Sequence, residues 1–249
     1  MKIIKYFILR ILIYLRIYPN ILFTFMPFKI YEFKELQKGI KFSKNEVILD
    51  IGCGSGLQTM LIGKKCKKIV GIDVSEKEIN SAKLQSRYIK GTNNSEFLCM
   101  ELEKAKFRNE YFDKIFAICV IEHIVDYKRV LQEAYRILKK NGQMIFSVDA
   151  LETIKDKKII EKHKKEHLVE KYFRKKELKI ILEEIGFKKI NIYPIFKSDF
   201  AQKSFIKGIN NKFRYTYLGS ILTYIFLNYK ENHCINKTKG IFLIMKCCK

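Results

Sequence analysis

Short apolar runs alternate with longer runs of helical periodicity through most of the chain. The apolar runs are typical of buried strands, which we expect at residues 46–51, 67–73, 95–100, 112–119, 142–149, 188–195 and 239–246. Helices are expected at residues 57–66, 75–89, 127–142 and 174–187. Ser75 and Glu78 form a capping box that starts the second helix, and Asn141-Gly142 is expected to end the third. This alternation predicts an α/β fold with a parallel sheet covered on both faces.

Residues 196–238 form an insertion between the last two expected strands. They contain "YTYLGSILTYIFLNY" (215–229), an uncharged run flanked by Arg214 and Lys230. Its 15 residues are fewer than the roughly 18–20 that a membrane-spanning helix needs. We expect this apolar helix to be a lid, a dimer face or a contact with a membrane.

The first 39 residues form a separate apolar and basic segment. Residues 3–28 are almost entirely apolar, but Arg10 and Arg16 interrupt them, which disfavours both a secretory signal and a membrane span. Placed on a helix, the basic residues cluster on one side of a broad apolar face. Two interpretations stay open: an amphipathic helix lying in a membrane surface, and a helix packed on the protein's own core.

Charge and cysteine content limit the partners and the compartment. The chain has 249 residues, 49 Lys and Arg against 26 Asp and Glu, and a formal net charge of +23. Such a surface attracts nucleic acid, anionic lipid or phosphorylated substrates. A codon bias toward lysine would produce the same net charge without any such partner. The seven cysteines include no C-x-x-C pair, which disfavours a zinc ribbon. We expect a cytoplasmic protein, with peripheral attachment to the inner face of the membrane as an option.

A glycine-rich loop follows the first strand in the stretch "ILDIGCGSGLQ". Gly52, Gly54 and Gly56 alternate, so the third glycine comes one residue earlier than in the dinucleotide-binding pattern G-x-G-x-x-G. No Gly-Lys-Ser/Thr follows, which excludes a P-loop. Asp50, at the end of the strand, disfavours a pyrophosphate and suits a ligand that carries an amino group.

A second acid, Asp73, ends the next strand, 17 residues after Gly56. A carboxylate in this place accepts hydrogen bonds from both hydroxyls of a ribose. Both acids lie at the carboxyl ends of strands, where open α/β sheets bind their ligands. Together with the loop they predict a site for an adenosyl ligand without phosphates.

Four motifs in sequence order now identify a family resemblance. "VILDIGCGSG", "VGIDVS", "YFDKIFAICVIEHI" and "RILKKNGQMIFSV" resemble motifs of the class I S-adenosylmethionine-dependent methyltransferases, in particular those that methylate quinones and other small molecules. The resemblance covers residues 40–195 and 240–246. It implies a methyltransferase domain over 40–249 with a Rossmann-like three-layer sandwich, in which a seven-stranded, mostly parallel sheet has its last strand antiparallel. It also implies S-adenosyl-L-methionine as the cofactor.

The resemblance assigns a role to each matching residue. The loop would approach the methionine part, Asp50 would receive its ammonium, Asp73 would hold the ribose, and Ile118 would line the methionine end. Val74 would pack on the adenine, Glu101 would face the adenine amino group, and the Leu102 amide would meet the ring. The complete predicted cofactor site is Asp50, Gly52, Cys53, Gly54, Gly56, Asp73, Val74, Glu101, Leu102 and Ile118.

Candidate catalytic residues follow the fourth strand in "CVIEHI". His123 would act as a base toward a hydroxyl, with Glu122 beside it. In quinone O-methyltransferases this stretch reads E-x-x-E-H and is associated with a divalent metal; here Cys119 replaces the first Glu, so we predict no metal. The alternative is that Glu122 and His123 only cap the next helix and fix a loop.

"HKKEH" (163–167) matches the zinc-hydrolase pattern H-x-x-E-H. It lies in a lysine-rich run with no pocket-forming strand beside it in the sequence. We therefore expect a solvated or substrate-covering helix rather than a zinc site.

Three functions remain open at this stage. The first is methyl transfer to a small or lipid-like acceptor, with an anionic membrane surface as a further partner. The second is methylation of RNA, which the charge of +23 favours but which no RNA-binding module supports. The third is a partner subunit that binds S-adenosylmethionine without catalysis. The sequence leaves the oligomeric state undetermined.

Overall fold

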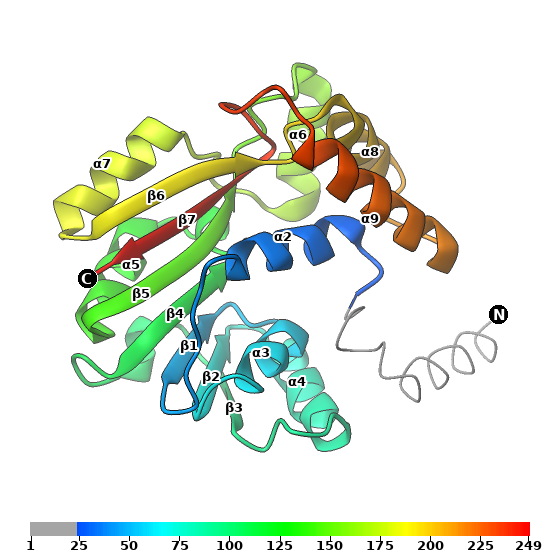
Figure 1. Cartoon of the computed structure of the whole chain (residues 1–249). Helices are drawn as coiled ribbons and strands as arrows, with labels where there is room; N and C mark the ends of the chain where they lie inside the picture. The colour runs from blue at the N-terminus through cyan, green and yellow to red at the C-terminus, as the bar shows by residue number, and fades with distance from the viewer. Residues whose placement is uncertain (1–23) are drawn as a thin grey trace.

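A seven-stranded sheet forms the centre of the computed structural model, which describes residues 24–249 (Figure 1). The strand order is β3-β2-β1-β4-β5-β7-β6, and β7 runs antiparallel to both of its neighbours while the other pairs are parallel. The predicted Rossmann-like architecture is confirmed. The strands are β1 (Val47–Ile51), β2 (Lys68–Asp73), β3 (Ser95–Cys99), β4 (Phe112–Ile118), β5 (Leu138–Asp149), β6 (Lys188–Ile195) and β7 (Phe242–Cys248).

Helices cover both faces of this sheet. On one face α5 and α7 pack over the sheet, and on the other lie α2, α3, α8 and α9. Figure 1 shows α2 crossing the front of the sheet beside α9. The helices are α2 (Pro27–Gln37), α3 (Leu57–Gly63), α4 (Glu76–Tyr88), α5 (Tyr127–Ile137), α6 (Lys157–His167), α7 (Lys175–Ile185), α8 (Asp199–Asn210) and α9 (Tyr217–Asn232), with short 3-10 turns η1 (Glu103–Ala105) and η2 (Ile121–His123).

The continuous apolar runs of the central strands are explained by burial on both faces. In β4, Ile115 and Ala117 pack toward α5 and α7, whereas Phe116 and Ile118 pack toward α2 and α8. Successive side chains of a strand point to opposite faces, so each of these layers needs its own apolar residues. Phe116 is fully buried and stacks on Phe42, with ring centroids 6.2 Å apart.

The predicted helix over 127–142 is wrong in its last part. The helix α5 ends at Ile137, and β5 begins at the next residue. Leu138 is fully buried and pairs with Phe112 of β4, so packing in the sheet overrides the helical pattern. Asn141 has a φ of 62°, which marks an irregularity inside β5 instead of a helix end.

Glycine and hydroxyl side chains mark other helix ends. The Ser75 hydroxyl accepts a hydrogen bond from the Glu78 amide at 3.3 Å and caps α4 as predicted, but the Ser75 amide donates to Asp73, so the second half of the predicted capping box is replaced by that bond. Gly186 ends α7 with a φ of 108°, a left-handed conformation that favours glycine. The insertion consists of α8 and α9, whose N-caps are Ser198 and Thr216.

The helix α2 lies in the core on the side of the sheet that carries α8. Phe28 is 1% exposed and packs edge-on against Phe196 and Phe205. Most of the apolar run 3–28, and with it the prediction of an in-plane membrane helix, lies outside the described residues. Within residues 24–249, none of the helices has the length and hydropathy required to cross a bilayer.

Candidate active site

The glycine loop connects the end of β1 to α3 in a left-handed conformation. The φ angles of Gly52, Gly54 and Gly56 are 67°, 52° and 78°. A Cβ on Gly52 would lie 2.3 Å from a methyl carbon of Val120, so a side chain does not fit there. A Cβ on Gly54 would meet no atom of the described chain within 4 Å. The loop therefore packs tightly at its start and leaves open space at Gly54, as close approach of a ligand requires.

Asp73 fixes this loop against the end of β2. One carboxylate oxygen accepts a hydrogen bond from the Gly54 amide at 2.8 Å, and the other accepts one from the Ser75 amide at 2.9 Å. Each oxygen retains a second lone pair, and the side chain is partly exposed. Asp73 is thus held in place by the backbone while it can still accept hydrogen bonds from a ligand, which is compatible with the predicted ribose contact.

Asp50 lies at the end of β1 and is only 2% exposed. Its carboxylate accepts a hydrogen bond from the Thr59 hydroxyl at 2.5 Å. Burial raises the pKa of Asp50 to about 7, and Asp73 adds to the rise, although the bond from Thr59 opposes it. A bound ammonium would stabilise the ionised form of this buried carboxylate, so Asp50 fits the predicted contact with the methionine part.

The other predicted cofactor residues lie around the same edge of the sheet. Val74 is 70% exposed after β2, and Glu101 is exposed and pairs with Lys104 at 2.9 Å. The side chains of Cys53, Leu102 and Ile118 are buried. The roles that the resemblance assigns to these residues stay predictions, whereas their convergence follows from the parallel strands β1, β2 and β4.

A pocket lies beside the end of β4, next to Ile118. It has a volume of about 210 Å³, and we call it the Asp149 pocket. Asp149 is the last residue of β5, as Asp73 is of β2, and Asp50 is the last but one residue of β1. The pocket is lined by Met26, Phe28, Lys29, Cys119, His123, Asp149, His163, His167, Phe205, Phe213 and Phe242. Because Cys119 directly follows Ile118, this pocket adjoins the predicted methionine end of the cofactor.

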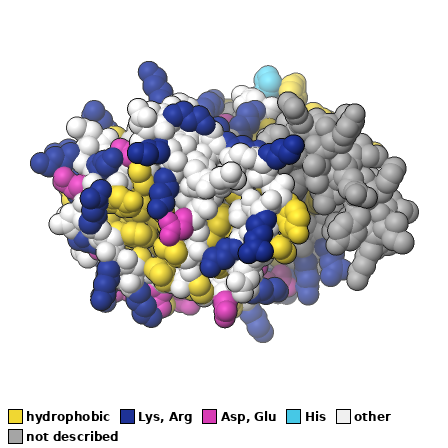
Figure 2. All heavy atoms as spheres, turned by 90° about the horizontal axis from the view of Figure 1, so that it is seen from below, with side chains coloured by type: hydrophobic (Ala, Val, Ile, Leu, Met, Phe, Trp, Pro, Cys, Tyr) yellow, Lys and Arg dark blue, Asp and Glu magenta, His cyan; other side chains and the backbone are white. Residues whose placement is uncertain are grey.

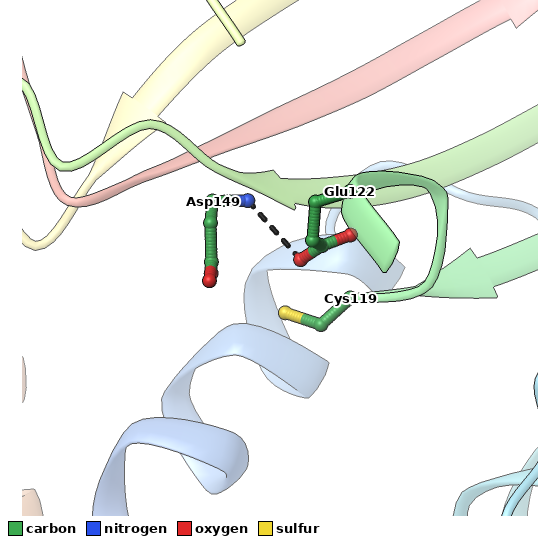
Figure 3. A group of neighbouring side chains, drawn as sticks. All are labelled: Cys119, Glu122 and Asp149. Carbon is green, nitrogen blue, oxygen red and sulfur yellow. Dashed lines mark hydrogen bonds between the residues drawn. The ribbon is translucent and has the colours of Figure 1, made fainter. Parts of the chain in front are cut away.

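Buried acids surround one lysine at this pocket. Glu122 is fully buried; one of its oxygens accepts a hydrogen bond from the Asp149 amide at 3.2 Å, and the other has no hydrogen-bond partner among residues 24–249 (Figure 3). Glu32 of α2 is also fully buried, accepts a bond from the Ser147 hydroxyl at 2.6 Å and pairs with Lys29 at 3.0 Å. Burial raises the pKa values of Asp149 and Glu122, and the Asp149 charge raises that of Glu122 further.

A thiol and two carboxylates of this cluster are close enough to share one ion. The ligand atoms of Cys119, Glu122 and Asp149 lie within 4.8 Å of one another. However, burial raises the pKa of the Cys119 thiol well above its usual value, and the nearby Glu32 adds to the effect. A metal ligand must be the thiolate, and the thiol instead donates a hydrogen bond to Glu32 at 2.9 Å. The residues present do not fit a metal ion well.

The two predicted catalytic residues differ in exposure: His123 is exposed, whereas Glu122 is buried. His123 is exposed at the edge of the Asp149 pocket, and its Nδ1 lies 3.2 Å from the Leu168 carbonyl oxygen. Glu122 is buried behind it, and its backbone oxygen accepts hydrogen bonds from the Glu170 and Lys171 amides. The Glu122 carboxylate binds the end of β5, so it does not cap α5, where Asp126 is the N-cap.

The helix that carries "HKKEH" lies over the Asp149 pocket, so of the two expectations, a solvated helix and a substrate-covering helix, its placement agrees with the covering one. The expectation that no pocket lies beside this motif is wrong. His163 of α6 is 3% exposed, and its Nε2 lies 3.7 Å from an Asp149 oxygen. Its Nδ1 lies 3.0 Å from the Tyr172 hydroxyl. Burial lowers the pKa of His163 to about 3, and His167 adds to this, so the imidazole is neutral.

Sequence reasoning missed Lys29, Glu32 and Asp149 as site residues. Asp149 had a usable signal, since it is a third acid at the end of an apolar run. The two α2 residues had none, because their place depends on how α2 packs across the sheet.

Comparison with known proteins gives the family. A protein-family model described as "Methyltransferase domain" matches residues 49–146. The ubiquinone biosynthesis O-methyltransferase of Pelagibacter ubique is 32% identical over 133 residues, which cover 51% of this chain and 54% of the relative. YrhH of Bacillus subtilis, which carries a methyltransferase name, is 30% identical over 130 residues, which cover 51% of this chain and 71% of that protein. The chain belongs to the class I S-adenosylmethionine-dependent methyltransferases.

The solved structures show the same fold. YcgJ of Bacillus subtilis has a TM-score of 0.62 and 16% sequence identity, and the match covers 88% of this chain and 98% of that one. The chain spans about half the length or less of the first curated relatives, 54% for the ubiquinone enzyme and 40% for the arsenite methyltransferase of Mus musculus. Those relatives are named for dissimilar acceptors, so they do not determine the acceptor of this chain.

The cofactor of this family is S-adenosyl-L-methionine, and the residues present fit it. The open space at Gly54, the bridging carboxylate of Asp73 and the buried carboxylate of Asp50 offer a cradle, a ribose acceptor and a partner for an ammonium. Bound there, the cofactor would supply an activated methyl group. The chain would hold it, align an acceptor and exclude water.

Proposed function

We propose that this protein transfers the methyl group of S-adenosylmethionine to a small-molecule acceptor held in the Asp149 pocket. The single observation that carries the proposal is the position of that pocket. It begins at Cys119, one residue after the predicted methionine end of the cofactor, and is closed by α2, α6 and α8. Its volume of about 210 Å³ is below the roughly 300–1,000 Å³ typical of sites for drug-sized ligands.

The chemistry required of the chain is mainly positioning. A sulfonium is already activated, so the acceptor atom must be aligned with the methyl group in a site that excludes water. Phe28, Phe205 and Phe242 form apolar walls, and each is at most 5% exposed. His123, exposed at the edge, is placed to exchange a proton with solvent.

The proposal is tested by filling the pocket with a larger side chain and measuring methyl transfer. Purified protein is incubated with tritiated S-adenosylmethionine and an extract of small molecules and lipids from the source cells, and labelled products are identified by mass. Phe205→Trp fills the pocket, whereas Leu84→Ser changes an exposed residue of α4 that is 52% exposed. We expect Phe205→Trp to abolish labelling while binding of S-adenosylhomocysteine persists, and Leu84→Ser to have no effect. Equal labelling by the Trp variant would refute the assignment of the pocket.

We also propose that the enzyme works at an anionic membrane surface. Five apolar side chains form an exposed face of α9, at 45–66% exposure: Leu218, Leu222, Ile225, Phe226 and Tyr229. Beside α9 lies a hollow of about 900 Å³ whose lining includes Lys34, Lys38, Lys64 and Lys65. Lysine and arginine are also spread over the face seen in Figure 2, with Asp and Glu less frequent. An apolar face next to cationic side chains suits a lipid surface.

Vesicle flotation tests this second point. The full chain is mixed with vesicles of phosphatidylcholine alone or with phosphatidylglycerol added. We expect recovery with the anionic vesicles only, and a several-fold loss for the double variant Ile225→Ser and Phe226→Ser. Leu84→Ser is the control, because it removes an equally exposed leucine on α4. Equal flotation of both variants would contradict a role for α9.

RNA methylation remains the alternative that the charge of +23 favours. It predicts tritium incorporation into total RNA, with activity that falls steeply as salt rises. Labelling of RNA instead of small molecules would replace the proposal above.

A further inference from the structure

Four phenylalanine rings line the Asp149 pocket and pack on one another. Phe205 lies edge-on to Phe28 at 5.4 Å, to Phe213 at 5.3 Å and to Phe242 at 5.7 Å between ring centroids. The Lys29 ammonium lies 5.8 Å from the centroid of Phe242. The pocket wall thus already holds one cation near an aromatic ring, the arrangement by which aromatic cages bind ammonium groups.

The charges around the pocket do not balance within the described chain. Glu32, Glu122 and Asp149 are each at most 4% exposed, and one ammonium, that of Lys29, lies among them. A buried carboxylate without a counter-charge is costly, so such a group retains a proton or acquires a cation. The groups that face Asp149 are Lys29 and Glu32 from α2, Cys119 and Glu122 from the β4–α5 connection, His163 from α6, and Tyr172.

The two histidines of α6, His163 and His167, do not supply the missing charge. Burial lowers the pKa of His163 to about 3, and burial also lowers the pKa of His167. Glu122 has one oxygen without a hydrogen-bond partner among residues 24–249. A carboxylate oxygen of Glu122 also lies within 4.8 Å of one of Asp149. A neutral acceptor would leave these acids protonated, whereas a positively charged one would allow them to ionise.

We propose that the methyl acceptor is a small organic cation, an amine that enters the Asp149 pocket in its ammonium form between the phenylalanine rings and the buried acids. This inference rests on the proposed function and names its substrate class. The aromatic rings favour an organic ammonium. A metal ion held by Cys119, Glu122 and Asp149 would require the Cys119 thiolate, which burial disfavours.

The transfer step balances without a further reactant. The ammonium loses its N–H proton to the Asp149 carboxylate, which frees the nitrogen lone pair. That pair forms the new N–C bond as the methyl C–S bond breaks, and the sulfur keeps the bonding electrons as a neutral thioether. Asp149 then holds the proton until it passes to solvent at the pocket edge, where His123 is exposed.

A matched pair of probes isolates the charge. Choline and 3,3-dimethylbutan-1-ol have the same shape, and only choline is positively charged. Each is titrated calorimetrically into the full chain loaded with S-adenosylhomocysteine at pH 7. We expect choline to bind at least about tenfold more tightly, and we expect its binding to release protons, because a bound cation favours the ionised acids. Proton release is measured as a dependence of the heat on the ionisation enthalpy of the buffer.

Two variants and a control complete the test. Asp149→Asn keeps the side-chain shape and should lower choline affinity about tenfold without changing binding of the alcohol. Phe205→Leu should lower choline affinity severalfold more than alcohol affinity. Glu161→Gln, an exposed acid-to-amide change on α6, should alter neither. Thermal unfolding of each loaded variant checks that the fold is retained.

The outcomes separate this inference from the proposed function. Equal or tighter binding of the neutral alcohol would overturn it, and so would tight binding of Mg²⁺ or Zn²⁺ alone that Asp149→Asn abolishes. If the protein binds S-adenosylhomocysteine and methylates a phenol or a thiol but not dimethylethanolamine, only the amine assignment fails. If it binds no S-adenosylhomocysteine, the proposed function itself fails.

Discussion

The buried carboxylate of Asp50 predicts an unusual dependence of stability on pH. Burial raises its pKa from 3.8 to about 7 in the folded chain. An acid whose pKa is higher in the folded state ionises first in the unfolded state. Its contribution to stability is therefore complete below about pH 4 and is lost as the pH rises to about 7.

The size of the effect follows from the shift. A rise of about 3 pH units corresponds to about 4 kcal/mol, at 1.36 kcal/mol per unit. Between pH 5 and pH 8 about 3 kcal/mol of this should be lost. Asp50→Asn cannot ionise, so its free energy of unfolding should lack this loss. Asp149 and Glu122 also have raised pKa values, but they titrate in both proteins and cancel in the comparison.

Urea unfolding of the two ligand-free proteins at pH 5 and pH 8 provides the assay. The stability of the variant relative to the wild type should increase by about 3 kcal/mol between the two pH values. Parallel changes in both proteins would refute the reasoning. A ligand pair adds a second readout: affinity for S-adenosylhomocysteine should rise about tenfold from pH 6 to pH 8, whereas affinity for methylthioadenosine, which lacks the ammonium, should stay constant.

Three further predictions concern the loop and the core. Gly52→Ala should destabilise the protein by about 1–3 kcal/mol in urea unfolding and weaken S-adenosylhomocysteine binding, because its Cβ would lie 2.3 Å from Val120. Gly54→Ala should destabilise the fold less, because its Cβ would meet no atom within 4 Å, but calorimetry should show weakened S-adenosylhomocysteine binding, because that Cβ would occupy the space left for the ligand. Asp73→Ala removes the acceptor for the Gly54 and Ser75 amides and should weaken that binding at least about tenfold; an unchanged affinity by calorimetry would argue against the ribose contact. Phe116→Ala empties a fully buried position and should cost about 3–5 kcal/mol in urea unfolding, and a loss below about 1 kcal/mol would contradict its place in the core.

The sheet and the glycine loop were predictable because their signals are local. Strands buried on both faces give continuous apolar runs, and the three glycines mark one loop by themselves. Since parallel strands end at a common edge, Asp50 and Asp73 could be brought together from sequence spacing alone. The end of α5 was not predictable in this way, because pairing of Leu138 with Phe112 in the sheet decides it.

The Asp149 pocket depends on contacts between distant segments. Glu32 is 115 residues from Ser147, and they meet only because α2 crosses the sheet. His163 lies next to Asp149 because α6 packs over the end of β5. A motif of charged residues and histidines in the sequence cannot reveal which of its members is buried. The residues predicted to bind the cofactor were therefore identifiable from sequence, whereas those of the pocket proposed for the acceptor were not.

A crystal structure of the full chain with S-adenosylhomocysteine would show whether the cofactor and the Asp149 pocket meet. We expect the ribose hydroxyls on Asp73, the ammonium at Asp50, and the sulfur facing the Asp149 pocket beside Ile118 and Cys119. A ligand bound elsewhere, or one whose sulfur is separated from that pocket by the chain, would contradict it.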